Sequence, residues 1–268
     1  MGRIENADYA NLQIERCDGG VLRVAIDRPG DPLNAVNGEL HSELARLFRE
    51  LRQEDDARAV LLTGSGRTFS AGGDFNWFPE LQDNEALEHL RRDAKQLIWD
   101  LLDVELPIVV AINGHAIGLG ASIALLSDVI FMADSATLAD PHVRVGIVAG
   151  DGGAAIWPLV LGPARAKEFL MTGDPVDAES AKRMGLVNHV LPADELETAA
   201  LDFARRLAQG APLAIRYTKQ AVNKLIKDAL NTSYDFSTAL EIVTFHSEDH
   251  REALAALSEK RPPRFKGR

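Results

Sequence analysis

Residues 111–122 read Ala-Ile-Asn-Gly-His-Ala-Ile-Gly-Leu-Gly-Ala-Ser and overlap the end of the apolar run 108–112. The apolar run predicts a buried strand, and the glycine-rich segment predicts a turn that opens a helix at about Leu119. A helix start carries unpaired backbone N–H groups that stabilise negative charge. Residues 63–75 repeat this arrangement around Gly72 and Gly73. Two such turns could together bind an oxyanion, although glycines in either turn could serve only tight turns and close packing.

Short strands and helices alternate on both sides of these turns. Alternating apolar residues predict a hairpin in the first 26 residues, and later apolar runs predict strands that are separated by amphipathic helices. Beyond residue 190 the pattern is helical only. We therefore expect an α/β core over residues 1–190 and a helical subdomain over 191–268, with its helices at 194–209, 212–230 and 233–260.

The composition argues against several classes of protein. Forty acidic residues against 29 basic ones give a net charge of -11, which argues against a nucleic-acid-binding surface. The uncharged stretch 106–127 approaches the length of a membrane span, but its proline and glycines predict a buried core segment instead. Cys17 is the single cysteine and the first residues lack a signal-peptide pattern, so we expect a cytoplasmic protein without disulfides or membrane association.

Ordered motifs along nearly the whole chain resemble the crotonase, or enoyl-CoA hydratase/isomerase, superfamily. These motifs are Asp27-Arg28-Pro29 with Asn34-Ala35-Val36, Phe69 to Asp74, Ala111 to Gly118, Ser127-Asp128, and Ala181 to Val187 with a Glu-Lys-Arg tail and Phe265. The resemblance implies a crotonase-like superhelix of stacked ββα turns with a helical C-terminal trimerisation subdomain, in a homotrimer or dimer of trimers. It also implies that the N–H groups of Gly73 and Leu119 form an oxyanion hole for a thioester enolate.

The substrate implied by the resemblance is an acyl-CoA or enoyl-CoA, so coenzyme A would enter with the substrate and no separate cofactor is expected. The family pattern places the coenzyme near the loop from Arg28 to Ala35 and near Ala71. It brings Lys260, Phe265 and Lys266 from a neighbouring subunit. Five basic residues face one acidic residue in the segment 259–268, and this positive charge suits phosphate groups. The alternative is a solvated basic end.

The residues at the reacting centre depart from the hydratase pattern. Two glutamates of the family's hydratases correspond here to Ser122 and His142, so ordinary hydration of enoyl-CoA is not expected. Asp151 lies nine residues beyond His142, after a glycine-rich return. We hypothesise that His142 is a general base and that Asp151 orients it. The alternatives are a core histidine at position 142 and an N-cap at position 151.

The spacing of His142 and Asp151 is similar to that of 6-oxocamphor hydrolase, a family member that cleaves a carbon-carbon bond in a β-diketone without coenzyme A. Three function classes therefore remain open: a coenzyme A thioester enzyme, a β-diketone hydrolase, and a non-catalytic acyl-CoA-binding protein. The other histidines show no metal-ligand spacing, so no metal is expected. His115 is expected to pack in the core.

Overall fold

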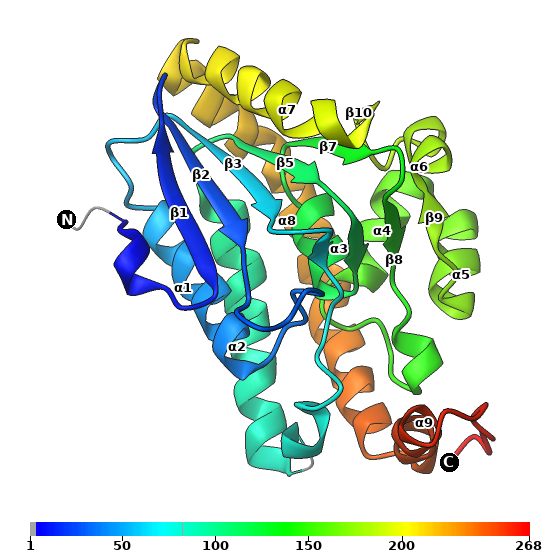
Figure 1. Ribbon diagram of the computed structural model, residues 1–268. Helices are drawn as coiled ribbons and strands as arrows, with labels where there is room; N and C mark the ends of the chain where they lie inside the picture. Colours follow the sequence, from blue (N-terminus) through cyan, green and yellow to red (C-terminus); the bar gives the residue numbers. More distant parts are fainter. Residues whose placement is uncertain (1–3, 82) are drawn as a thin grey trace.

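The computed structural model describes residues 4–81 and 83–268 (Figure 1). A six-stranded sheet has the order β1-β2-β3-β5-β7-β10, and a four-stranded sheet has the order β4-β6-β8-β9. The strands are β1 (Leu12–Cys17), β2 (Val21–Ile26), β3 (Ala59–Gly64), β4 (Thr68–Ser70), β5 (Ile108–Ile112), β6 (His115–Ile117), β7 (Val129–Ala133), β8 (Thr137–Ala139), β9 (Val176–Asp177) and β10 (His189–Leu191).

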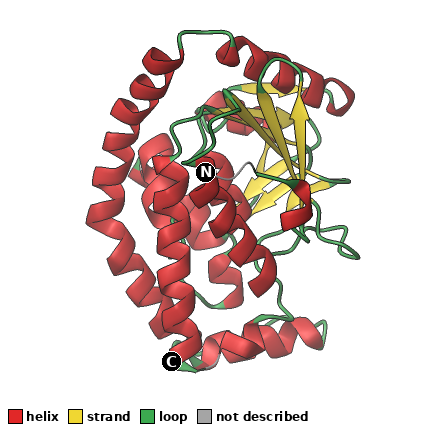
Figure 2. Cartoon of the chain, turned by 90° about the vertical axis from the view of Figure 1, so that its left-hand side faces the viewer, coloured by secondary structure: helices red, strands yellow, loops and turns green. Residues whose placement is uncertain are grey.

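Helices lie between and after these strands. The α-helices are α1 (Gly38–Leu51), α2 (Asn84–Asp103), α3 (Leu119–Leu125), α4 (Gly153–Leu161), α5 (Pro163–Thr172), α6 (Ala178–Met184), α7 (Ala193–Ala208), α8 (Pro212–Phe245) and α9 (Glu248–Ser258). The short 3-10 helices are η1 (Asn6–Asp8), η2 (Phe78–Leu81) and η3 (His142–Val145). Figure 2 shows the longest helices grouped on one side of the strands.

From β3 to β8, successive strands alternate between the two sheets. In the larger sheet β3, β5 and β7 run parallel to one another, and their partners β4, β6 and β8 run parallel in the smaller sheet. The helices α2, α3 and α4 follow these strand pairs in turn. This arrangement confirms the predicted α/β fold of stacked ββα turns.

The larger sheet forms the core because its central strands are apolar on both faces. Every residue of β3 and β5 is buried, as expected for parallel strands that are covered on both sides. The stretch 106–127 forms β5, β6 and α3. Within residues 4–81 and 83–268, no helix is both long and apolar enough to cross a membrane.

The C-terminal helices differ from the expected boundaries. The sequence suggests a break near residue 231, but α8 continues without interruption from Pro212 to Phe245. Ser233 does not interrupt the helix, because its hydroxyl donates a hydrogen bond to the Ala229 carbonyl one turn earlier, at 3.0 Å. The predicted domain boundary at residue 190 stays a prediction. Helix α7 begins just after that residue and packs across the larger sheet (Figure 1).

A buried ion pair fixes α8 to the core. The Lys219 Nζ atom lies 2.8 Å from Asp128 Oδ2 and donates to the Leu106 carbonyl at 2.9 Å. Asp128 also accepts a hydrogen bond from the Ile108 N–H at 2.7 Å. Burial raises the pKa of Asp128 and lowers that of Lys219, and each residue's charge opposes the other's shift. The pair therefore joins the long helix to the start of β5.

We expect Lys219→Met to lower the free energy of unfolding by about 3 to 5 kcal/mol, because it leaves Asp128 buried without its partner. Urea denaturation followed by circular dichroism measures the change. Lys224→Met is the control on the same helix, since Lys224 pairs with Asp228 at an exposed position and should change stability by less than about 1 kcal/mol. Equal stability of the two variants would contradict the anchoring role of Lys219.

Candidate active site

The first glycine loop follows β4, and in it the N–H of Gly73 points away from Val36, with which Gly73 forms a parallel bridge. The Val36 N–H donates to the Gly72 carbonyl at 2.7 Å, and the Asp74 N–H donates to the Val36 carbonyl at 2.9 Å. These bonds use the groups on either side of Gly73, so its own N–H points to the opposite side. A Cβ atom on Gly73 would lie 2.8 Å from the Phe78 ring. A larger residue at position 73 would therefore displace the Phe78 ring.

The second glycine loop ends at Leu119, the first residue of α3. The N-cap residue is Gly118, which has a φ of 53° and supplies no capping side chain. The N–H of Leu119 therefore lacks an intrahelical acceptor and a side-chain cap. A Cβ atom on Gly72 would lie 2.8 Å from the Ile117 carbonyl oxygen. The two loops thus touch through their backbones, which brings the regions of Gly73 and Leu119 together.

A cavity of about 90 Å³ lies beside the two loops. Gly73 and Leu119 line it, and so do His142 and Asp151. Its remaining walls are largely apolar and aromatic, with Trp77, Phe78, Leu87 and Phe245 among them. This combination of an apolar wall with a few converging polar groups is typical of a small-molecule site. The structure therefore brings the four predicted catalytic positions to one cavity.

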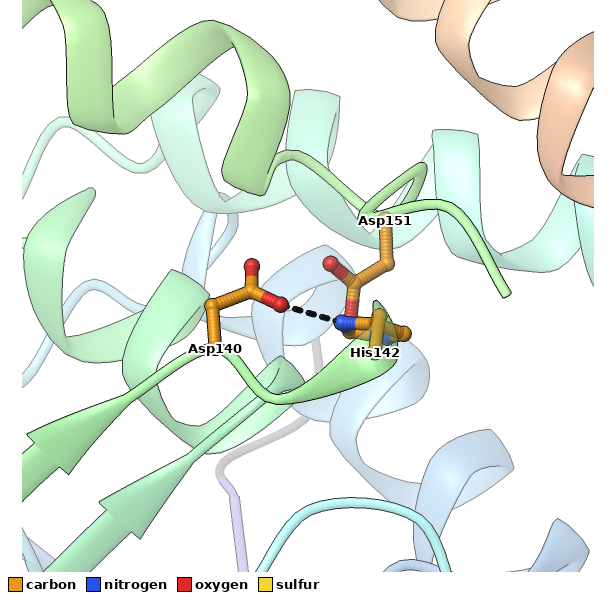
Figure 3. Close-up of side chains that lie close together, drawn as sticks. All are labelled: Asp140, His142 and Asp151. Atoms are coloured by element: carbon orange, nitrogen blue, oxygen red, sulfur yellow. Dashed lines mark hydrogen bonds and ion pairs between the residues drawn. The ribbon is translucent and has the colours of Figure 1, made fainter. Parts of the chain in front are cut away.

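Two aspartates flank the His142 ring (Figure 3). Asp140 follows β8 and hydrogen-bonds to His142 Nδ1 through its Oδ1 atom. Asp151 lies just before α4, and its Oδ2 atom is 3.6 Å from His142 Nε2. The sequence predicts that Asp151 orients His142, but the structure places Asp140 on the nitrogen that such a partner would hold. Asp151 instead faces the nitrogen that is free for proton transfer.

The Asp140 carboxylate has little free space around it. Its side chain is buried, and its Oδ2 atom has no hydrogen-bond partner among the described residues. A Cβ atom on Gly153 would lie 1.9 Å from that oxygen. Gly153 is the first residue of α4, so the Asp140 carboxylate lies at the N-terminus of that helix. A side chain at position 153 would collide with this carboxylate. The motif Asp140-Pro141-His142 was visible in the sequence, but only the fold shows that Asp140 turns back to His142.

The charges around His142 stabilise its protonated form. Burial lowers the pKa of His142, but the nearby charges of Asp140 and Asp151 outweigh burial and raise it well above its ordinary value. Burial raises the pKa of Asp151, and the His142 charge opposes that shift. The site therefore favours an imidazolium near neutral pH, which differs from the neutral imidazole expected from the sequence.

Helix α8 adds two side chains that the sequence analysis missed. Glu241 lines the cavity, and burial raises its pKa to about 8. A Cβ atom on Gly150 would lie 2.2 Å from Glu241 Oε2, so Glu241 packs against the loop that leads to Asp151. Tyr234 lies two turns earlier on α8, and its buried hydroxyl has no hydrogen-bond partner within the described part of the chain. No local motif marks either residue, because each lies about a hundred positions from His142 along the chain.

Ser122 lies beside the charged group formed by Asp140, His142 and Asp151. Its hydroxyl donates to Asp151 Oδ1 at 3.4 Å. Ser122 is buried on α3. A serine here can orient the Asp151 carboxylate, but it cannot supply a carboxylate of its own.

The predicted coenzyme contacts lie apart from the charged group. Arg28 donates to Asp74 and Asp31 at 2.7 and 3.0 Å and to the Ala35 carbonyl at 2.8 Å, so its guanidinium ties its loop to the first glycine loop. Ala71 lines a hollow that adjoins the cavity and shares Gly73 and His142 with it.

The basic tail folds back on α9 of its own chain. The Asp249 carboxylate accepts hydrogen bonds from the backbone N–H groups of Lys266 and Gly267 at 2.6 and 2.8 Å. Arg261 forms an ion pair with Glu252 at 2.5 Å. Across residues 4–81 and 83–268, the Lys260 and Lys266 side chains form no ion pair, and Phe265 is about half exposed. These three side chains therefore remain accessible in the single chain.

Two further expectations concern histidines and metals. His115 is exposed and its Nδ1 lies 2.7 Å from the Thr137 hydroxyl, so the expected core packing is wrong. Its strand is short and carries alternating side chains, of which Ala116 points inward. Asp140, His142 and Asp151 each bring one ligand atom within 4.8 Å of the others, so these residues could hold a cation. The predicted absence of a metal stays a prediction.

Comparison with known proteins identifies the family of this chain. The enoyl-CoA hydratase/isomerase family profile matches residues 16–268. The chain belongs to the enoyl-CoA hydratase/isomerase family. A probable enoyl-CoA hydratase of Mycobacterium bovis is 33% identical over 257 residues, which cover 96% of this chain and 98% of the relative.

Solved structures of family members show the same fold. An enoyl-CoA hydratase/isomerase from Mycobacterium paratuberculosis superposes with a TM-score of 0.87 at 37% identity, over 92% of this chain and 98% of the other. A β-diketone hydrolase from the cyanobacterium Anabaena, bound to (S)-3-oxocyclohexyl acetic acid, gives a TM-score of 0.85 at 32% identity with the same coverage. The chain is therefore a crotonase-fold enzyme of this family, as the sequence motifs predict.

The raised pKa of Glu241 predicts how stability changes with pH. A carboxyl group whose pKa is near its ordinary value when unfolded and about 8 when folded binds a proton more tightly in the folded state. Its contribution to stability is complete below the unfolded pKa and is lost as the pH rises through about 8. We expect Glu241→Gln to be more stable than the wild type at about pH 9 and to lose this advantage below about pH 4.5.

Thermal and urea denaturation across this pH range measure the effect. Glu179→Gln is the control, because the Glu179 side chain is 92% exposed. An advantage of Glu241→Gln that is constant with pH, or one shared by the control, would contradict the titration of Glu241.

Proposed function

We propose that this enzyme stabilises the enolate of an acyl thioester of coenzyme A, and that the His142–Asp151 pair moves the proton. The observation that carries the proposal is the position of His142, held by Asp140 at one nitrogen and facing Asp151 with the other, in the cavity that Gly73 and Leu119 line. A carbonyl oxygen beside the two glycine loops would accept hydrogen bonds from both backbone N–H groups. Such preorganised donors supply about 3 to 4 kcal/mol each to the stabilisation of an oxyanion.

The chemistry follows from one proton that His142 and Asp151 hold between them. In its base form the pair takes a proton from the carbon next to the thioester carbonyl. The electrons of that C–H bond form the enolate double bond, and the charge collects on the carbonyl oxygen in the oxyanion hole. With a β,γ-unsaturated thioester the proton can then return at the γ carbon, which moves the double bond into conjugation with the carbonyl and neutralises the enolate. Asp140 acts through His142 by fixing its orientation and raising its pKa.

The support for coenzyme A comes from the family and from the surface near the cavity. The Mycobacterium bovis relative is named as an enoyl-CoA hydratase. Ala71 lines a hollow that shares Gly73 and His142 with the cavity, and its N–H donates to the carbonyl of Leu33, in the loop between Arg28 and Ala35, at 2.9 Å. The accessible Lys260, Phe265 and Lys266 would meet the nucleotide portion of a coenzyme on a neighbouring subunit. Because Arg28 is already engaged by Asp31 and Asp74, we assign its coenzyme contact to the loop backbone.

This arrangement requires an oligomer, for which we propose a homotrimer or a dimer of trimers. Helix α8 leaves large apolar side chains uncovered in the single chain, with Leu225 71% exposed and Phe236 70% exposed. Exposed apolar surface of this kind is typical of a protein–protein contact.

A second candidate function is hydrolysis of a carbon-carbon bond in a β-diketone. Tyr234 and a protonated Glu241 both present hydrogen-bond donors to the cavity, and a diketone has a second carbonyl oxygen to accept them. The Anabaena relative is a β-diketone hydrolase. In this reaction the base form of the pair would remove a proton from water, which attacks one carbonyl carbon. The bond to the central carbon would break, and the enolate left behind would take up the proton.

Substitutions of the charged group test its role. We expect His142→Ala and Asp151→Asn each to lower turnover by about 100- to 10,000-fold, and the double variant to lose little more, because the two residues act as one unit. The rate should rise with pH as His142 loses its proton. Asp140→Asn removes a negative charge, lowers the pKa of His142 and should move this rise to lower pH. Near-normal turnover of His142→Ala would contradict the proposal.

A substrate panel separates the two candidate functions. Because Ser122 and His142 replace the two hydratase glutamates, crotonyl-CoA should be hydrated about 100- to 10,000-fold more slowly than by a two-glutamate hydratase of the family. Calorimetric titration should nevertheless show binding of acetyl-CoA and weaker binding after removal of residues 260–268. Rapid hydration of crotonyl-CoA would refute the first expectation. Turnover of a cyclic 1,3-diketone without any binding of coenzyme A would establish the second candidate function instead.

A further inference from the structure

His250 connects the last helix to the segment that carries His142. His250 lies on α9 and is fully buried. Its Nδ1 atom lies 2.7 Å from the carbonyl oxygen of Val145. Val145 is the final residue of η3, and His142 is the first. A single turn of backbone therefore separates the His250 contact from the His142 side chain.

The surroundings of His250 define its protonation state. Burial lowers the pKa of His250, and the charge of Arg251 lowers it further, while the bond to Val145 raises it. The rings of Phe245 and Phe78 pack against it, with centroids at 5.1 and 5.9 Å. Its Nε2 atom is buried without a partner within the described residues. The neutral ring must therefore carry its proton on Nδ1, since a carbonyl oxygen can only accept a hydrogen bond.

The contact with α9 leaves little freedom to the turn after η3. Gly146 has a φ of 72°, and a Cβ atom on it would lie 2.9 Å from the backbone nitrogen of His250. The Val148 N–H donates to the Thr244 hydroxyl of α8 at 3.1 Å. The two C-terminal helices thus hold the segment from η3 to Val148 from one side, while Asp140 and Asp151 hold the His142 ring from the other.

We propose that His250 is a positioning residue for His142: its Nδ1–H···O bond to Val145 fixes η3 so that the His142 ring stays between Asp140 and Asp151. The proposal rests on the proposed role of His142 in proton transfer. It gives α9 a part in catalysis although α9 contributes no side chain to the reacting centre. It also links the tail to the site, because Asp249, the neighbour of His250, binds the backbone of Lys266 and Gly267.

Two amide substitutions test the bond directly. Asn can place its N–H group near the position of Nδ1, whereas Gln places it near Nε2, so His250→Asn keeps the donor and His250→Gln removes it. The pKa of His142 is measured by NMR on protein with labelled histidines, with His142→Asn used to assign its signal. His246→Asn is the control, because His246 is exposed at the end of α8.

We expect the pKa of His142 to fall toward its ordinary value in His250→Gln and to remain raised in His250→Asn and in the control. Turnover should fall by about 10- to 100-fold in His250→Gln with little change in KM, because a small displacement of a catalytic group acts on the chemical step. Restoration of both quantities in His250→Asn would support the proposal.

Other results would overturn it. A His142 pKa that is unchanged in His250→Gln would show that the bond does not position the ring. Equal losses in His250→Gln and His250→Asn would show that His250 only fills space. The proposed proton transfer fails separately, if His142→Asn retains full turnover, and the NMR measurement still decides the positioning role in that case.

Discussion

The whole site depends on the close approach of backbone segments in neighbouring ββα turns. A Cβ atom on Gly114 would lie 1.9 Å from the Arg67 carbonyl oxygen of the preceding turn, and within one turn a Cβ atom on Gly64 would lie 2.3 Å from the Thr68 carbonyl oxygen. The same condition holds between Gly72 and Ile117 at 2.8 Å. Only residues without a side chain allow this stacking. The stacking aligns the two glycine loops, so that groups from separate turns can face one carbonyl oxygen.

The charged group at His142 shows how burial and charge oppose each other. Burial alone would favour neutral forms of all the titratable side chains. Because Asp140 and Asp151 lie on opposite sides of one imidazole, their charges instead stabilise its protonated form. Among the described residues Glu241 forms no ion pair, and burial raises its pKa to about 8. The site thus holds titratable protons at the His142–Asp151 pair and at Glu241.

The C-terminal helices complete the site from outside the ββα core. Helix α8 contributes Tyr234 and Glu241 to the cavity wall, and the Lys219–Asp128 pair fixes that helix to the sheet. Helix α9 reaches the back of η3 through His250. The last third of the chain therefore takes part in forming the site, in addition to the oligomeric contacts that we propose for its exposed apolar face.

The sequence by itself determined the fold class, the family and the neighbourhood of His142 and Asp151, because glycine loops, buried strands and ordered motifs are local patterns in the chain. It also indicated Gly73 and Leu119, whose roles depend on backbone position. The tertiary structure alone decided that Asp140 contacts His142 Nδ1 and that Asp151 faces Nε2, because the sequence does not show how the chain turns between these three residues. It alone brought Glu241, Tyr234 and His250 to the site, because contacts between residues about a hundred positions apart depend on how α8 and α9 pack, and no periodicity in the sequence records that packing.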